Sequence, residues 1–181
     1  MVFNPMEKAF KEILVSEFVS ITGGLAAGTI LALFTEKLLL VPGLFILLPG
    51  FLEMRGNIAG SLSARLNSAL HIGSLRPGEK NPILSANNVA AFVLGILVSA
   101  ILGVIAYLAT FFILGVSNPS IIVVSLIAAV LSNIAMIWLT TSTTIWLFKK
   151  GFDPENIMGP YITTVGDIIS IVSLLVAIVI V

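Results

Sequence analysis

The amino-acid sequence predicts an all-α integral membrane protein with five transmembrane helices. Hydrophobic residues make up 58% of the 181 residues and charged residues only 10%, whereas soluble domains carry about a quarter charged residues. A helix needs about 20 mostly apolar residues to cross a bilayer, and five stretches of the chain meet that requirement. A chain of this length and composition is therefore expected to form one membrane-embedded unit.

At the N-terminal end, the sequence predicts a short amphipathic helix followed by the first span. Residues 1–16 carry apolar side chains at helical spacing, so this segment is expected to lie on the cytoplasmic membrane surface. The residues on that face are Met6, Phe10, Ile13 and Leu14. The first span runs from Glu17 to Phe34, which divides the chain into a cytoplasmic segment, 1–16, and a transmembrane domain, 17–181.

The second span, from about Leu38 to Leu70, is expected to be broken. Pro42 and Pro49 each lack the backbone N–H that a helix interior needs, and each is followed by a glycine. Irregular backbone within a membrane must be buried in protein or line a watery cavity. Transporters place ion sites at such broken helices, because the freed carbonyl groups coordinate the ion.

Three further spans complete the expected five, and the basic residues of the loops orient them. These spans are Asn87–Leu114, Ser120–Phe148 and Pro160–Val181. Cytoplasmic loops are enriched in lysine and arginine. One set of loops contains Lys8, Lys11, Arg76, Lys80, Lys149 and Lys150, and the opposite set contains Lys37. The N-terminus is therefore expected in the cytoplasm and the C-terminus outside.

Polar residues on the second span suggest a wall of oxygen ligands. Glu53, Asn57 and Ser61 are four residues apart, so they share one face of a helix. A carboxylate, an amide and a hydroxyl suit a hard cation such as Mg²⁺. The alternative is that Glu53, Arg55 and Arg65 lie near the interface, pair locally and extend to water.

Asp167 is the single charged residue of the last span. A charged side chain at the membrane centre costs at least about 2.5 to 3.5 kcal/mol, so intramembrane carboxylates are rare and usually functional. Thr163 lies one turn before it and Ser170 about one turn after it, and the adjacent Gly166 leaves room for a close approach. The alternative is an ion pair with one of the two arginines of the second span.

Two stretches resemble the MgtE family of magnesium transporters, and in particular the branch that contains its vertebrate solute-carrier relatives. The stretch RGNIAGSLSARLNSALHIG resembles the family's second-helix signature, and FDPENIMGPYITTVGD resembles its final Asp-Pro, Gly-Pro, Thr-Thr and Asp pattern. The resemblance extends from the first span to the end of the chain, and five helices with the N-terminus inside is the family topology. Bacterial members have glutamine at the position of Ser61, and Glu53 departs from the family pattern.

The resemblance implies roles for individual residues. The aspartate that matches Asp167 lines the pore and holds a hydrated magnesium ion, and the asparagine that matches Asn57 lies near the conduction path. We therefore expect Asp167, Asn57 and Thr163 to hold the metal ion. The further pore-lining candidates are Glu53, Ser61, Gly56, Gly166, Thr164 and Ser170.

The expected function is transport of divalent cations, with Mg²⁺ as the expected ion, across the cell membrane. The vertebrate relatives hold two five-helix units in one chain, so a single unit is expected to form a homodimer with its pore at the seam. The alternatives are an ion-coupled exchanger and a non-transporting membrane assembly subunit. No nucleic acid partner is expected at zero net charge. An enzyme is not expected either, because the sequence shows no nucleophile–base set and contains no cysteine.

Overall fold

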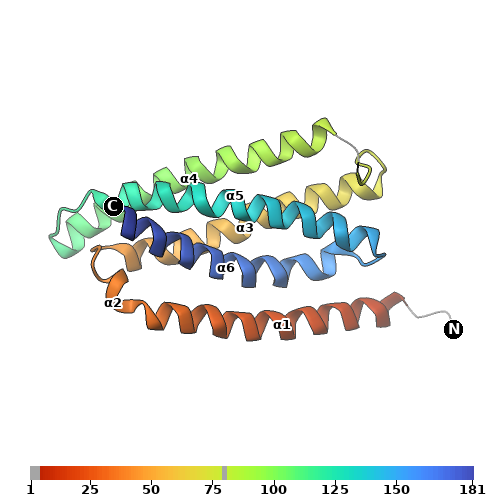
Figure 1. The fold of residues 1–181 in the computed structure, drawn as a ribbon, viewed down its shortest axis with the longest axis horizontal. Helices are drawn as coiled ribbons and strands as arrows, with labels where there is room; N and C mark the ends of the chain where they lie inside the picture. Colours follow the sequence, from red (N-terminus) through yellow and green to blue (C-terminus); the bar gives the residue numbers. More distant parts are fainter. Residues whose placement is uncertain (1–4, 79–80) are drawn as a thin grey trace.

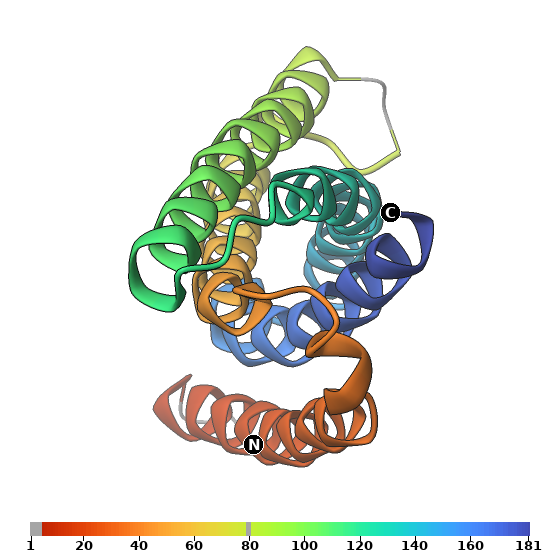
Figure 2. The same ribbon diagram turned by 90° about the vertical axis from the view of Figure 1, so that its left-hand side faces the viewer.

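The computed structural model describes residues 5–78 and 81–181, and all regular secondary structure in these residues is helical. The long helices lie side by side in a bundle (Figure 1). They are α1 (Pro5–Leu33), the short α2 (Thr35–Leu38), α3 (Leu44–His71), α4 (Pro82–Leu114), α5 (Ser120–Lys149) and α6 (Pro154–Ile180). Helix α3 packs against α4, α5 and α6, whereas α1 lies beside α6 at the edge of the bundle (Figure 2).

Four helices of the described chain are long and apolar enough to cross a membrane: Met6–Leu33, Pro82–Leu114, Ser120–Lys149 and Pro154–Ile180. The all-α membrane class is therefore confirmed. Helix α3 is not among the four. With 28 residues it is about 42 Å long at 1.5 Å per residue, which exceeds the roughly 30 Å of a bilayer core. Five crossings, and the orientation derived from them, stay predictions.

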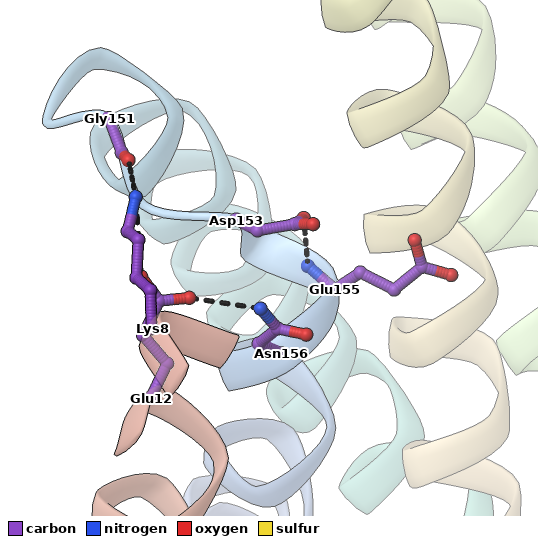
Figure 3. A network of polar contacts seen from close by, with 6 residues as sticks. All are labelled: Lys8, Glu12, Gly151, Asp153, Glu155 and Asn156. Atoms are coloured by element: carbon purple, nitrogen blue, oxygen red, sulfur yellow. Dashed lines mark hydrogen bonds and ion pairs between the residues drawn. The ribbon is translucent and has the colours of Figure 1, made fainter. Parts of the chain in front are cut away.

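The prediction of a separate surface helix before the first span is wrong. Helix α1 is continuous over 29 residues, because neither proline nor glycine interrupts the chain between Pro5 and Gly23. Its N-terminal half is held against the α5–α6 connection (Figure 3). Lys8 Nζ donates to the Gly151 carbonyl at 2.8 Å, and Asn156 Nδ2 donates to Glu12 Oε2 at 2.9 Å. The predicted division at residue 16 falls inside this helix, and a functional division there stays a prediction.

The predicted break in the second span lies at one proline and not at the other. The chain leaves the helix at residues 39–43 and re-enters it after Gly43, whose φ of 84° is in the left-handed region that glycine tolerates. Pro49 lies inside α3, which continues through it to His71. The prediction of a break at Pro49 is therefore wrong. Packing of α3 against three neighbouring helices offsets the loss of the one backbone hydrogen bond that proline cannot make.

We expect Gly43→Ala to lower the thermal stability of the detergent-solubilised protein. A side chain at this φ is strained, and its Cβ would collide with Thr110. The free energy of unfolding should fall by more than about 1 kcal/mol. Gly78→Ala is the matched control, since Gly78 has a φ of +95° but no neighbour within 4 Å of an added Cβ. Equal melting temperatures for the two variants would exclude the contact with Thr110 as a cause.

Small residues allow α4 and α5 to approach closely. Along α4 the residues Ala91, Gly95, Ser99 and Gly103 are four apart and all buried. The polar residues of α5 make bonds between or along the helices: Ser125 Oγ donates to the Ser99 carbonyl at 2.9 Å, and Thr144 Oγ1 lies 3.0 Å from Ser63 Oγ on α3. The bundle is therefore held together by close backbone contact and buried hydrogen bonds, as is typical of membrane helices.

Candidate cation site

An open groove of about 380 Å³ lies between α3 and α6. Its polar lining comes from both helices at intervals of four residues, because side chains four residues apart lie on one helix face. On α3 these residues are Glu53 and Asn57, and on α6 they are Thr163 and Asp167. The other lining residues are Pro49, Leu52, Gly56, Gly60, Gly159, Ile162 and Gly166.

The α3 wall carries an internal hydrogen bond. Asn57 Nδ2 donates to Glu53 Oε1 at 3.2 Å, and both side chains are exposed. The amide nitrogen of Asn57 can only donate, so its carbonyl oxygen is the atom that can accept a bond from a ligand. The wall therefore presents carboxylate and amide oxygens, which are acceptors for a metal ion or for its bound waters.

The α6 wall carries a second carboxylate and a hydroxyl. Asp167 is half-buried, and Thr163 is exposed with its Oγ1 donating to the Gly159 carbonyl at 3.1 Å. The space beside Gly166 is occupied from α5, since an added Cβ would lie 3.3 Å from Met136 Cε. The residues that the groove brings together are thus two carboxylates, one amide and one hydroxyl.

Neither arginine of α3 forms an ion pair with Asp167, so that alternative is wrong. The ion pairs found among residues 5–78 and 81–181 are Lys8–Glu12 and Lys11–Glu7. Arg65 is exposed, and its Nε donates to a carbonyl one turn earlier on its own helix at 3.2 Å. Arg55 is buried between α3, α4 and α5. The alternative in which Arg55 extends to the membrane interface is therefore also wrong, because its side chain points into the bundle.

Three of the predicted pore-lining residues do not line the groove. Ser61 is exposed one turn beyond Asn57, and its backbone carbonyl accepts the bond from Arg65. Thr164 faces α1, where its Oγ1 donates to Ser20 Oγ at 2.9 Å. Ser170 is fully buried, and its Oγ has no hydrogen-bond partner in the described chain. A pore-lining role for these three residues stays a prediction.

The groove of a single copy does not enclose a metal ion. Residues 5–78 and 81–181 contain no group of three or more His, Cys, Asp or Glu side chains placed to hold one. Mg²⁺ retains several of its six waters and is often bound through only one or two carboxylates. Two carboxylates, one on each wall of an open groove, fit that mode of binding, in which the ion stays hydrated.

Sequence reasoning missed Gly60 and Gly159 as groove-lining residues and also missed the position of Arg55. Gly60 and Gly159 line the groove, and their lack of a side chain keeps it open. The helical turn of 100° per residue could have separated Arg55 from Glu53, since two residues correspond to 200° and place them on nearly opposite faces of α3. The buried Asn133 of α5, whose Oδ1 accepts a hydrogen bond from Arg55, was a second available signal.

The bundle and its groove define a helical membrane protein with a polar, carboxylate-bearing groove between two long helices. The sequence model of the MgtE family, described as divalent cation transporter, matches residues 48–177. This range includes α4 and α5 completely and both walls of the groove. The chain belongs to the MgtE family of divalent cation transporters.

Similar curated proteins include vertebrate members of one solute-carrier family. The chain is 31% identical over 173 residues to solute carrier family 41 member 2 of Homo sapiens and 29% identical over 174 residues to the protein of that name in Mus musculus. Each of these alignments covers 88% of this chain and 29% of the relative. The chain therefore spans less than a third of the length of these relatives. No solved structure matches the chain.

Proposed function

We propose that the protein transports divalent cations across the cell membrane, with Mg²⁺ as the cargo, along the groove between α3 and α6. The observation that carries the proposal is the pair of carboxylates, Glu53 and Asp167, which line one groove without an arginine or lysine paired to them in the described chain. Membership of a divalent cation transporter family supports the same cargo.

We propose further that two copies form a homodimer with the α3–α6 grooves facing each other. In a single copy the polar side chains Glu53, Asn57 and Thr163 are exposed, and a charged group exposed to lipid costs at least about 2.5 to 3.5 kcal/mol near the membrane centre. A second copy, related by a two-fold axis, would cover both grooves and remove that cost. The seam would then present four carboxylates to one path.

In this arrangement the ion passes as a hydrated cation. The carboxylates of the two copies attract a divalent ion without removing its waters, because Mg²⁺ dehydrates reluctantly. Asn57 and Thr163 hydrogen-bond the waters that the ion retains. Passage also requires binding weak enough for the ion to leave. We favour conduction down the electrochemical gradient over ion-coupled exchange.

A flux assay tests the proposed function. Purified protein in liposomes that contain a Mg²⁺-sensitive dye is expected to raise internal Mg²⁺ faster than protein-free liposomes do. Repeating the assay with an imposed proton or sodium gradient separates conduction from exchange, since only an exchanger requires the second ion. A folded, reconstituted dimer that produces no flux above the protein-free background would contradict the proposal.

Cysteine cross-linking tests the seam, because the sequence contains no cysteine and a single introduced thiol reports one position. We expect Thr163→Cys, on the groove, to give a covalent dimer with a bifunctional thiol-reactive cross-linker in membranes. Trp138→Cys is the matched control, since Trp138 is exposed on α5 and lies outside the α3–α6 groove. Cross-linking at position 138 without cross-linking at position 163 would place the dimer contact elsewhere.

A further inference from the structure

Arg55 is a buried cation on the side of α3 that faces α4 and α5. Its exposed fraction is 2%. Its Nη1 donates to Asn133 Oδ1, and its Nη2 donates to Ser99 Oγ and to the Ala129 carbonyl, both at 3.4 Å. The guanidinium also lies 5.0 Å from the centre of the Phe51 ring. Every one of these partners is neutral.

The positive charge of Arg55 is not neutralised where it lies. Neither ion pair of the described chain includes it, and its Nε is buried without a hydrogen-bond partner. The cavity beside it measures about 10 Å³, which is room for about one water molecule and not for a polyatomic anion. Burial of an ion without a counter-ion is costly, so a compensating negative charge is expected elsewhere in the bundle.

The carboxylates that the structure offers are those of the cation groove. Glu53 is two residues from Arg55 on α3 and lines the groove, on the nearly opposite side of the helix, and Asp167 lines the same groove from α6. A helix with its side chains is about 10 Å wide. The guanidinium therefore lies behind the α3 wall of the groove, close enough for a charge in a poorly screened interior to act on a bound cation.

We infer that Arg55 sets the cation affinity of the transport path by adjusting the charge of that path to the charge of one divalent cation. The inference rests on the proposed function. Each copy supplies the two groove carboxylates and one guanidinium, so the path of a dimer carries two net negative charges, which one divalent ion neutralises. Without Arg55 the path carries four negative charges and retains the ion too strongly for rapid release.

The test removes or keeps the charge while preserving hydrogen bonds. In Arg55→Gln the charge is lost, and the half-saturating Mg²⁺ concentration in the liposome flux assay is expected to fall about ten-fold, with a lower maximal flux. A unit charge acting on a divalent ion across about 12 Å changes affinity between about 3-fold and 100-fold, depending on the effective dielectric constant. Arg55→Lys keeps the charge and is expected to shift the half-saturating concentration by less than about 3-fold.

Charge compensation distinguishes this role from a structural one. Glu53→Gln alone is expected to raise the half-saturating concentration about ten-fold, and combining it with Arg55→Gln should return the value toward that of the wild type. Arg65→Gln is the matched control, because this exposed arginine does not line the groove, and it should shift neither parameter. If Arg55→Gln does not fold, Arg55→Met with Asn133→Leu removes the charge and its main partner together.

Several results would overturn the inference. One is an unchanged half-saturating Mg²⁺ concentration in Arg55→Gln. Another is an unchanged half-saturating concentration in Glu53→Gln, a variant that leaves the buried Arg55 in place. Equal losses of flux in Arg55→Lys and Arg55→Gln, without recovery in the double variant, would mean that Arg55 serves packing alone. In each of these cases flux that still depends on Asp167 would leave the proposed function intact, whereas absence of flux in the wild type would remove both.

Discussion

Asp167→Asn is expected to reduce Mg²⁺ flux by at least about 100-fold while the protein remains folded. The substitution keeps the shape of the side chain and removes its negative charge. A hydrated divalent ion in a poorly screened groove is attracted mainly by such charges, so their loss weakens its binding. The structure gives Asp167 no ion-pair partner within residues 5–78 and 81–181, so the loss of charge leaves no cation of the protein unpaired. Flux into dye-loaded liposomes measures the effect.

Glu17→Gln is the matched control for this prediction. Glu17 is an exposed carboxylate on α1 and does not line the α3–α6 groove, so its conversion to the amide should leave flux within about two-fold of the wild type, in line with the small effect of a distant exposed charge. Size-exclusion chromatography of both variants verifies that each is folded and has the oligomeric state of the wild type. Wild-type flux in Asp167→Asn would remove Asp167 from the transport path.

Gly103→Leu is expected to prevent stable packing of α4 on α5. A Cβ at this position would lie 3.1 Å from Ile122 Cα and 3.1 Å from Ser125 Cβ. Because the first of these atoms belongs to the backbone, it cannot move aside as a flexible side chain would. Overpacking of this kind costs about 1 to 3 kcal/mol and occasionally more. Because a leucine adds three further carbon atoms beyond Cβ, we expect the free energy of unfolding to fall by more than about 3 kcal/mol.

The measurement is the melting temperature of the detergent-solubilised protein, followed by loss of the monodisperse peak in size-exclusion chromatography. Gly24→Leu is the control, since Gly24 is a helical glycine of α1 with no atom within 4 Å of an added Cβ. It should melt within a few degrees of the wild type. A melting temperature of Gly103→Leu equal to that of the control would mean that α4 and α5 separate easily at this crossing.

Composition and periodicity were sufficient to predict the membrane class and the residues that share a helix face. Long apolar stretches predicted the membrane class, and four-residue spacing placed Glu53 with Asn57 and Thr163 with Asp167 on shared helix faces, where the structure has them. These properties are local, because the hydrogen bonds and side-chain directions of a helix depend on residues within about one turn. The family also followed from local signatures and is confirmed by the match to residues 48–177.

Tertiary packing decided what the sequence left open. It determined that the α3 face with Glu53 meets the α6 face with Asp167, and that Thr164, one residue from Thr163, turns toward α1 instead. It also determined that Pro49 stays inside a helix and that Arg55 points into the bundle, away from Asp167. Amphipathic spacing specifies which residues share a face, but only the complementary shapes of neighbouring helices specify which faces meet.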